Sequence, residues 1–311
     1  MSQKKKKVLI TGIGGYLGST VLRILPNDYE VIGYGHNANF ARLKKIRPKN
    51  LVLYEGDITD IKKLTEAIQD LDVVVHTAGI VGNKACLSDP WRAIQTNVRG
   101  TRTVVEAIKN VYKNDTPLVL HVSTQSVYGT FVERPMPLTE EMSMAPDDFY
   151  GATKAEAEWE IGKIPSIILR LTNLYGYGAG IGHEKNVVSK FVDMTIRGEE
   201  IILFGDGSQG IDFIHIDDVA GVIVKIIENP KEKNSVYNVG AGEATPMKDV
   251  ATCVQTIGKK FKKEGSIIFK EAPPGKIWPS RWVSHKKIKN IIPEFIPQNL
   301  ESGVEELFEK L

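Results

Sequence analysis

Short apolar runs alternate with amphipathic stretches through the first half of this 311-residue chain. The apolar runs occupy residues 8–10, 30–34, 51–54, 72–76, 118–123 and 166–171. The stretches at 16–25, 60–69 and 90–112 have helical spacing, and Asp89-Pro90 marks the start of the last one. Strands that alternate with helices need crossover connections, which produce a parallel sheet with helices on both faces. The pattern therefore predicts a doubly wound α/β fold.

The regular alternation of apolar runs and amphipathic stretches ends after residue 172. Residues 173–183 are rich in Gly and Tyr and are expected to form a loop. Helices are expected at 186–197 and 217–228, and a strand at 235–239. Prolines are frequent between 265 and 297, which predicts an irregular segment rather than sheet core.

The charge balance excludes several classes of protein. Forty Lys and Arg stand against 38 Asp and Glu, a formal net charge of +2, whereas a nucleic-acid binder would show a strong basic excess. No apolar run reaches the roughly 18 residues of a membrane span, and the apolar run after Lys7 is too short for a secretory signal. The two cysteines, Cys86 and Cys253, indicate a reducing cytoplasm rather than a disulfide framework.

A glycine-rich turn follows the first expected strand. Gly12, Gly15 and Gly18 connect this strand to a helix, which is the context of a dinucleotide-binding fingerprint. The first glycine permits the turn, the second lets the backbone approach a pyrophosphate, and the third lets the helix pack on the strand. The expected cofactor-binding segment comprises Gly12, Gly14, Gly15, Tyr16, Leu17 and Gly18. We expect a Rossmann-type domain over 1–172, to which 212–239 return, and a substrate-binding cap of 173–211 and 240–311.

The end of the second strand bears on the identity of the cofactor. An acid near this point usually binds the ribose 2′-hydroxyl of NAD, but no carboxylate lies between Glu30 and Glu55. His36, Asn37 or Arg42 could instead donate to a 2′-phosphate. The absence of the acid favours NADP over NAD, and NAD bound without the carboxylate stays open as the alternative.

Tyr150 and Lys154 are four residues apart, which places both side chains on one face of a helix. A nearby ammonium stabilises a phenolate, so the lysine can make this tyrosine an acid/base near neutral pH. Thr124 ends the fifth strand, at the sheet edge where sites of parallel sheets form. We therefore expect Thr124, Tyr150 and Lys154 to be catalytic, with Thr124 bonded to a substrate oxygen.

The order of these motifs resembles the extended short-chain dehydrogenases/reductases, specifically the NAD-dependent epimerase/dehydratase group. The resemblance runs from Thr11 to about Leu307. Its segments are TGIGGYLG, GDITD at 56–60, HTAG at 76–79, DPWRAIQTNVRGT at 89–101, STQSVYG at 123–129, YGATK at 150–154, LRLTNLYGYG at 169–178, FGDGSQGIDFIHIDDVA at 204–220 and YNVG at 237–240. It implies hydride transfer between a secondary alcohol or ketone and a nicotinamide, while Tyr150 takes the hydroxyl proton and Lys154 bonds the nicotinamide ribose.

The resemblance also implies roles for residues outside the catalytic group. Asp57 and Ile58 would flank the adenine, and Thr77, Ala78 and Gly79 would line the cofactor. Asn97 is expected to belong to the cofactor-binding residues and to tie the fourth and fifth strands together. Substrate-binding positions are Val81, Gln125, Ser126, Asn173 and Lys190, with Asn173 on a substrate phosphate. Helices 90–112 and 151–161 would form a four-helix bundle in a homodimer.

Two arginines typical of nucleotide-sugar members are absent. Ile211 and Pro273 stand at these positions, which puts a diphosphate-bearing substrate in question. Lys190, Lys276 or Arg281 could compensate for them. Gln125-Ser126 replace the Asp-Glu pair of the dehydratases, so we exclude dehydration. The cluster of Asp212, His215, Asp217 and Asp218 is interpreted as a helix start, with Asp217-Asp218 as cap and first-turn acid, and no metal is expected.

Three functions remain for the chain. The favoured one is a nucleotide-sugar 4-epimerase, and the second is an NADP-dependent reductase or dehydrogenase of a sugar or another carbonyl substrate. A non-catalytic cofactor-binding regulator is the third, against which the intact Thr124, Tyr150 and Lys154 argue.

Overall fold

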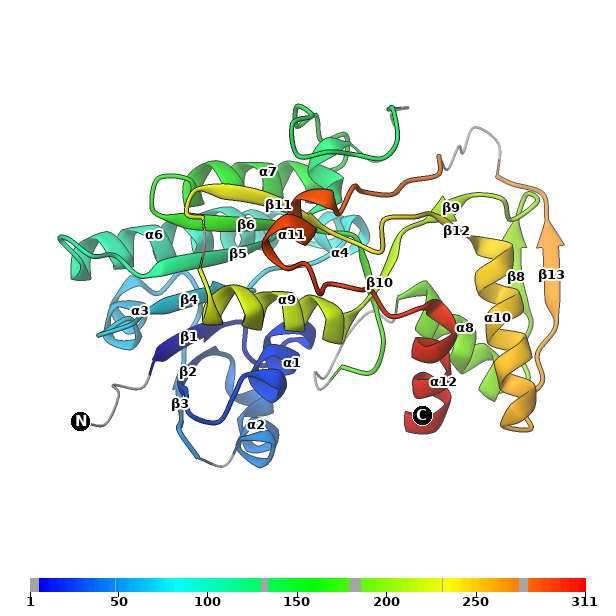
Figure 1. Cartoon of the computed structure of the whole chain (residues 1–311), viewed down its shortest axis with the longest axis horizontal. Coiled ribbons are helices and arrows are strands. Elements are labelled where there is room, and N and C mark those ends of the chain that lie inside the picture. The colour runs from blue at the N-terminus through cyan, green and yellow to red at the C-terminus, as the bar shows by residue number, and fades with distance from the viewer. Residues whose placement is uncertain (1–5, 48, 130–133, 179–185, 231, 274–278) are drawn as a thin grey trace.

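The computed structural model describes residues 6–47, 49–129, 134–178, 186–230, 232–273 and 279–311 (Figure 1). Its centre is a seven-stranded sheet in the order β11-β6-β5-β4-β1-β2-β3, and every strand pair in it is parallel. The strands are β1 (Lys7–Thr11), β2 (Glu30–Gly35), β3 (Leu51–Glu55), β4 (Val73–His76), β5 (Leu118–Thr124), β6 (Ser166–Leu171) and β11 (Ser235–Val239). The doubly wound fold is confirmed.

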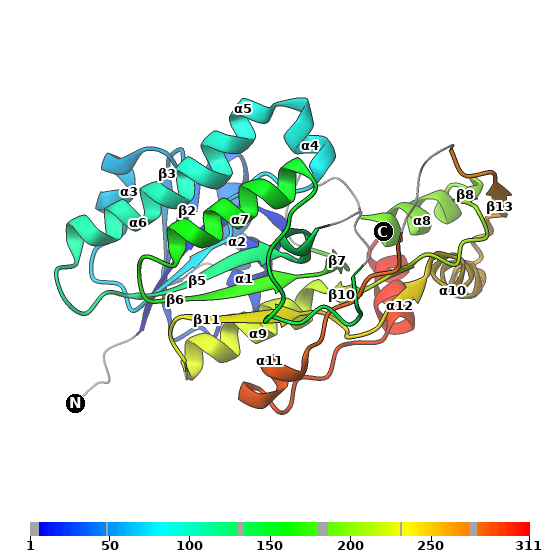
Figure 2. The ribbon, with the colours of Figure 1, turned by 90° about the horizontal axis from the view of Figure 1, so that it is seen from above.

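Helices cover both faces of this sheet (Figures 1 and 2). One face carries α1 (Tyr16–Ile24) and α9 (Ile216–Glu228), which pack on each other, with α2 (Phe40–Ile46) beside α1. The other face carries α3 (Ile61–Ala67), α6 (Gly100–Val111) and α7 (Phe149–Ile161). Each face of the sheet has a hydrophobic core, and successive strand residues belong to opposite cores: Val8 and Ile10 lie in the core on the α1 side, and Leu9 in the core on the α3 side.

The expected helix at 90–112 is interrupted. It consists of α5 (Pro90–Ala93), a π-helical segment η2 (Ile94–Arg99) and α6, and the side chain of Asp89 caps α5 by accepting from the Arg92 N–H. The sequence reading also missed α4 (Asn83–Ser88), directly before α5. Two short 3₁₀ segments, η1 (Asn37–Asn39) and η3 (Gln125–Tyr128), follow β2 and β5.

A further hydrophobic core lies apart from the two cores of the sheet, in elements from the segments expected to form the cap, and these elements are called the cap below. It contains α8 (Val187–Ile196), α10 (Met247–Lys260) and α12 (Leu300–Lys310), with a parallel pair of strands, β8 (Ile201–Phe204) and β13 (Ile267–Lys270). The proline-rich segment is more regular than expected, because β13 and α11 (Lys286–Ile291) lie within it. Its strand nonetheless pairs only with β8 and stays outside the central sheet.

Short strands join the cap to the sheet. In the expected loop at 173–183, β7 (Asn173–Tyr175) forms a strand parallel to β10 (Phe213–His215), and β9 (Gly210–Ile211) pairs with β12 (Thr245–Pro246). Buried Asp212 fixes this junction. Its carboxylate accepts from the hydroxyl of Thr172 (3.1 Å) and from three backbone N–H groups, those of Ala241, Gly242 and Val283 (2.7–3.2 Å).

The start of α9 corrects the expected cap. His215, rather than Asp217, is the N-cap residue, and its Nδ1 accepts from the Asp217 N–H at 3.3 Å. Asp217 and Asp218 both lie in the first turn, where the helix dipole favours acids. Within the described ranges, no helix combines the length and the apolar character needed to cross a membrane.

Candidate active site

The glycine turn between β1 and α1 leaves no room for side chains at two positions. Gly12 has φ +67°, and a Cβ there would lie 2.7 Å from the backbone nitrogen of Ala78. A Cβ on Gly18 would lie 2.5 Å from the Gly12 carbonyl oxygen. Gly15 is the N-cap of α1 and offers no side chain to occupy the N–H groups of the first turn. These N–H groups, at the positive end of the helix, fit a pyrophosphate.

The next two residues of the turn face the protein. The Tyr16 hydroxyl donates to the Gly176 carbonyl at 2.6 Å, and its ring occupies the space where a Cβ on Gly178 would fall. Leu17 packs against the core on the α1 side. Asn39 steadies the turn from η1, because its amide donates to the Gly14 carbonyl at 2.9 Å.

The adenine side of the expected site is open. His36 and Asn37 are both exposed at the end of β2. Asp57 is exposed after β3, and its carboxylate accepts from the hydroxyl (2.6 Å) and N–H (2.9 Å) of Thr59, which lowers the pKa of Asp57. The side chain of Ile58 is buried against Gly100, so only its backbone could face a base.

Asn97 has different partners from those expected. Its amide oxygen accepts from the Ile80 N–H (2.7 Å), and its NH₂ donates to the Ile80 carbonyl and the Thr153 hydroxyl (both 3.0 Å). It therefore ties the loop after β4, which holds Thr77, Ala78 and Gly79, to α7 rather than to β5. The interpretation that it joins the fourth and fifth strands was wrong.

Thr124 and Tyr150 meet at the carboxyl edge of the sheet. Thr124 is the last residue of β5, Tyr150 lies in the first turn of α7, and their hydroxyls are hydrogen-bonded. Asp148 caps α7 by accepting from the Gly151 N–H at 2.6 Å. Burial raises the pKa of Tyr150, as do the neighbouring Cys86 and Asp148, whereas the bond to Thr124 lowers it.

Lys154 lies one helical turn after Tyr150 on α7, and its side chain reaches β5. Its Nζ donates to the Val122 carbonyl at 2.5 Å and lies 3.4 Å from the Nε2 of His121. Burial lowers the pKa of Lys154 to about 8, while Glu158 and Cys86 oppose the shift. Glu158 is held in turn by a buried ion pair with Arg170, at 2.7 Å.

The expected substrate residues are spread over both parts of the chain. Val81 is exposed, Gln125 is buried, and the Ser126 N–H donates to the Thr124 hydroxyl at 3.2 Å. Asn173 begins β7, where its amide donates to the Asp212 carbonyl at 3.3 Å. Lys190 is exposed on α8 in the cap. Gln125 and Ser126 thus lie next to Thr124 as they do in the sequence, whereas Lys190 lies on the surface of the cap.

Arg281 lies beside Ile211, the position where an arginine was expected. The Arg281 N–H donates to the Gly210 carbonyl at 3.0 Å, and its carbonyl accepts from the Asp212 N–H at 3.1 Å. Its guanidinium, however, donates to the Gly129 carbonyl after η3. Lys276, the other proposed substitute, lies outside the described residues.

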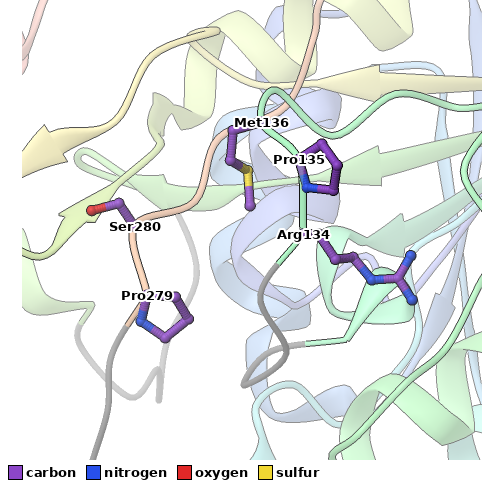
Figure 3. Close-up of a pocket in the computed structure, with 5 residues that line it drawn as sticks. All are labelled: Arg134, Pro135, Met136, Pro279 and Ser280. Carbon is purple, nitrogen blue, oxygen red and sulfur yellow. The ribbon is translucent and has the colours of Figure 1, made fainter.

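An open cavity of about 420 Å³ lies beside the segment that carries Arg281 (Figure 3). Arg134, Pro135 and Met136 line one side, and Pro279 and Ser280 line the other. The Ser280 hydroxyl accepts from the Gly210 N–H at 2.8 Å. The cavity therefore separates a loop of the sheet domain from the segment that carries Arg281.

Residues 8–240 match the model of the NAD dependent epimerase/dehydratase family, which is most of the chain. The chain belongs to this family. It is accordingly an enzyme of the extended short-chain dehydrogenase/reductase type, as the resemblance implied, with an epimerase-like function that acts through a nicotinamide dinucleotide.

Solved structures share the whole fold. A UDP-glucose 4-epimerase of Thermotoga maritima, with UDP-glucose, is 26% identical, has a TM-score of 0.82 and covers 97% of each chain. A UDP-glucuronic acid 4-epimerase of Bacillus cereus, with UDP-glucuronic acid and NAD, is also 26% identical, with a TM-score of 0.82 and coverage of 97% and 98%. A UDP-N-acetyl-alpha-D-glucosaminuronate decarboxylase of Bacillus cytotoxicus is 26% identical over 87% of this chain and 86% of its own.

The sequence assigned no role in the site to three residues that lie around Thr124, Tyr150 and Lys154. Cys86 lies close enough to Tyr150 and Lys154 to affect both, but burial raises the pKa of its thiol to about 11. Asp148 could have been found, because an Asp before a helical pattern is a typical N-cap. His121 is an imidazole within the otherwise apolar start of β5, an unusual choice for a buried strand.

Proposed function

We propose that this chain is a nucleotide-sugar 4-epimerase that uses NAD. The observation that supports it best is the hydrogen-bonded pair of Thr124 and Tyr150 at the carboxyl edge of the sheet, with the buried Lys154 one helical turn after Tyr150 on α7. A cofactor-binding regulator would need no acid/base group there. Relatives with 26% identity over nearly the whole chain, named as UDP-sugar 4-epimerases, support the same function.

In this proposal the chain's own residues handle the proton. Tyr150 takes the proton from the C4 hydroxyl and later returns it, and Thr124 orients the same oxygen. The Lys154 ammonium stabilises the phenolate form of Tyr150. A bound nicotinamide supplies the acceptor and the donor of the hydride. Rotation of the 4-keto sugar between the two transfers inverts C4.

Dehydration is not proposed, because it needs a second acid/base next to the catalytic threonine. Gln125 and Ser126 follow Thr124 here, and neither an amide nor an unactivated hydroxyl delivers a proton at neutral pH. We also assign Val81, Gln125, Ser126, Asn173 and Lys190 to the substrate side, and Gly12, Gly15, Gly18, Asp57 and Thr77 to Gly79 to the cofactor.

The choice of NAD departs from the preference that the sequence suggested. The missing carboxylate after β2 favoured NADP, but a solved relative with a bound cofactor holds NAD, so an NADP preference has no support. Native mass spectrometry of the purified protein tests this. Retained NAD supports an epimerase, whereas empty protein that binds NADPH tightly would favour the alternative, an NADP-dependent reductase.

Activity is tested by NMR of nucleotide sugars incubated with the enzyme. UDP-glucose, UDP-glucuronate and UDP-N-acetylglucosamine should be compared, since inversion at C4 changes the coupling of the C4 proton. The Tyr150→Phe variant is the matched control, because it keeps the ring and loses the hydroxyl. No epimer from any of the three, with NAD bound, would refute the proposal.

We further propose that the enzyme is a cytoplasmic homodimer. Leu87, Trp91 and Ile94 on the α4–η2 side and Trp159 on α7 are exposed apolar side chains, with 69% of Trp91 accessible. Trp91, Ile94 and Trp159 lie on the helices expected in the four-helix bundle, and Leu87 lies on α4, directly before the first of them. Both cysteines are free, as expected in a reducing compartment. Light scattering should show a dimer that Trp91→Glu dissociates, and a monomeric parent protein would contradict this.

A further inference from the structure

We propose that His121 is a positioning residue, whose Nε2 accepts a hydrogen bond from the Lys154 ammonium and keeps that ammonium charged, one helical turn from Tyr150. The inference rests on the proposed function, in which Lys154 acts on Tyr150. Nothing in the motif around Tyr150 and Lys154 includes His121, which belongs to a different element, β5.

The contact is direct and fully enclosed. His121 has no accessible surface, and its Nε2 lies 3.4 Å from the Lys154 Nζ. Among the described residues, this ammonium has one other hydrogen-bond acceptor, the Val122 carbonyl, at 2.5 Å. The two acceptors are neighbours on β5, so the strand itself fixes where the lysine ends.

The hydrogen bonds of the adjacent His76 constrain the imidazoles. The Thr101 hydroxyl donates to the Asn97 carbonyl at 2.7 Å, so its oxygen must accept from the His76 Nε2 at 3.0 Å. Burial lowers the pKa of His76 to about 3, so the ring is neutral and its Nδ1 accepts from the Thr11 hydroxyl at 2.7 Å. The His76 ring lies 5.2 Å from the His121 ring.

His121 must be neutral as well, since a second cation beside Lys154 would be repelled in this enclosed site. Burial and the Lys154 charge both hold the pKa of His121 well below its ordinary value. Acceptance at Nε2 requires the proton on Nδ1, which has no hydrogen-bond partner within the described part of the chain. A buried donor without a partner is costly, so this histidine is poorly explained by packing alone.

The surroundings of Lys154 show why this acceptor matters. Burial opposes the ammonium, while Glu158 from α7 and Cys86 from α4 favour it. His76 from β4 is neutral, and the charge of Glu158 is already shared with Arg170. A hydrogen bond to the charged form favours that form. Removal of His121 therefore shifts Lys154 toward the neutral amine, which cannot stabilise a phenolate.

The test measures the lysine directly. In cofactor-free protein labelled with ¹³Cε-lysine, the Lys154 signal, assigned with Lys154→Arg, is titrated by NMR. We expect His121→Phe, which keeps a ring of similar size without an acceptor, to lower the titration midpoint by about one pH unit. His121→Gln, whose amide oxygen can accept, should restore it. His121→Leu provides a second apolar variant if His121→Phe does not fold.

The kinetic arm uses the same variants. The alkaline limb of kcat/KM should move to lower pH by the same amount in His121→Phe, which reduces kcat/KM about tenfold above the limb. Val119→Ala, a buried change elsewhere on β5, should lower stability and leave both midpoints in place. An unchanged Lys154 midpoint in folded His121→Phe overturns the inference, whatever substrate the enzyme uses. Absence of turnover in the parent protein would instead count against the proposed function alone.

Discussion

Replacing Glu158 by Leu should strongly destabilise the folded protein. Glu158 and Arg170 form an ion pair at 2.7 Å, and their side chains are only 4% and 6% exposed. The Ser123 hydroxyl donates to the same carboxylate at 2.5 Å, and Arg170 donates to the Tyr128 hydroxyl at 2.9 Å. Glu158→Leu leaves the guanidinium buried without its carboxylate, which costs about 3–5 kcal/mol. Arg170→Met should cost about the same, for the same reason.

The double variant distinguishes this reasoning from simple loss of contacts. Glu158→Leu with Arg170→Met removes both charges, and only the Ser123 and Tyr128 hydroxyls lose a partner, at about 1 kcal/mol each. Urea unfolding, followed by tryptophan fluorescence, gives the free energy of unfolding of the parent, both single variants and the double. Lys163→Met, at the more exposed pair with Glu160, is the control and should change stability by under about 1 kcal/mol. A double variant whose loss equals the sum of the two single losses would refute the argument.

Three further changes have defined outcomes. Tyr150→Phe should lose turnover by orders of magnitude yet retain cofactor in native mass spectrometry; near-normal turnover would remove its acid/base role. Gly18→Val should weaken NAD binding more than about tenfold by calorimetry, because a Cβ there meets the Gly12 carbonyl at 2.5 Å; unchanged affinity would contradict a phosphate-binding turn. Burial raises the pKa of Asp212 from 3.8 to about 6, so the folded protein binds this proton more tightly than the unfolded chain. That contribution to stability is complete below pH 3.8 and is lost as pH rises through 6. The free energy of unfolding of Asp212→Asn should lack this pH dependence, and an equal slope against pH in both proteins would disprove the reasoning.

The central sheet was predictable because each of its strands carries a local signal. Apolar runs and helical spacing place β1 to β6 and β11 without knowledge of their partners. The cap was predicted less well, since β8 and β13 pair across a long stretch of chain, and each is only four residues long. The helix α10 begins directly after Pro246 and was missed, although proline is a typical residue before or at a helix start.

The candidate site shows the same division between local and distant contacts. Thr124, Tyr150 and Lys154 were found because a strand end and a four-residue spacing are readable in the sequence. The partners of Asn97 were assigned wrongly, because whether its amide reaches β5 or α7 depends on how the π-helical segment η2 presents it. His121 was missed for a similar reason, since only the packing of α7 on β5 brings Lys154 to it.

The electrostatics of the site therefore depend on residues far from the reacting atoms. Glu158 faces Lys154 and favours its charged form, but its own position is set by Arg170 on β6. Arg170 donates to Tyr128, whose hydroxyl donates to the Asn238 amide oxygen on β11 at 2.8 Å. A change on β11 can thus alter the charge next to Lys154 through a chain of fully buried bonds, because low dielectric surroundings strengthen each of them. Lys154, proposed to be catalytic, is held between this network on one side and His121 on the other, and the motif around Tyr150 reveals neither.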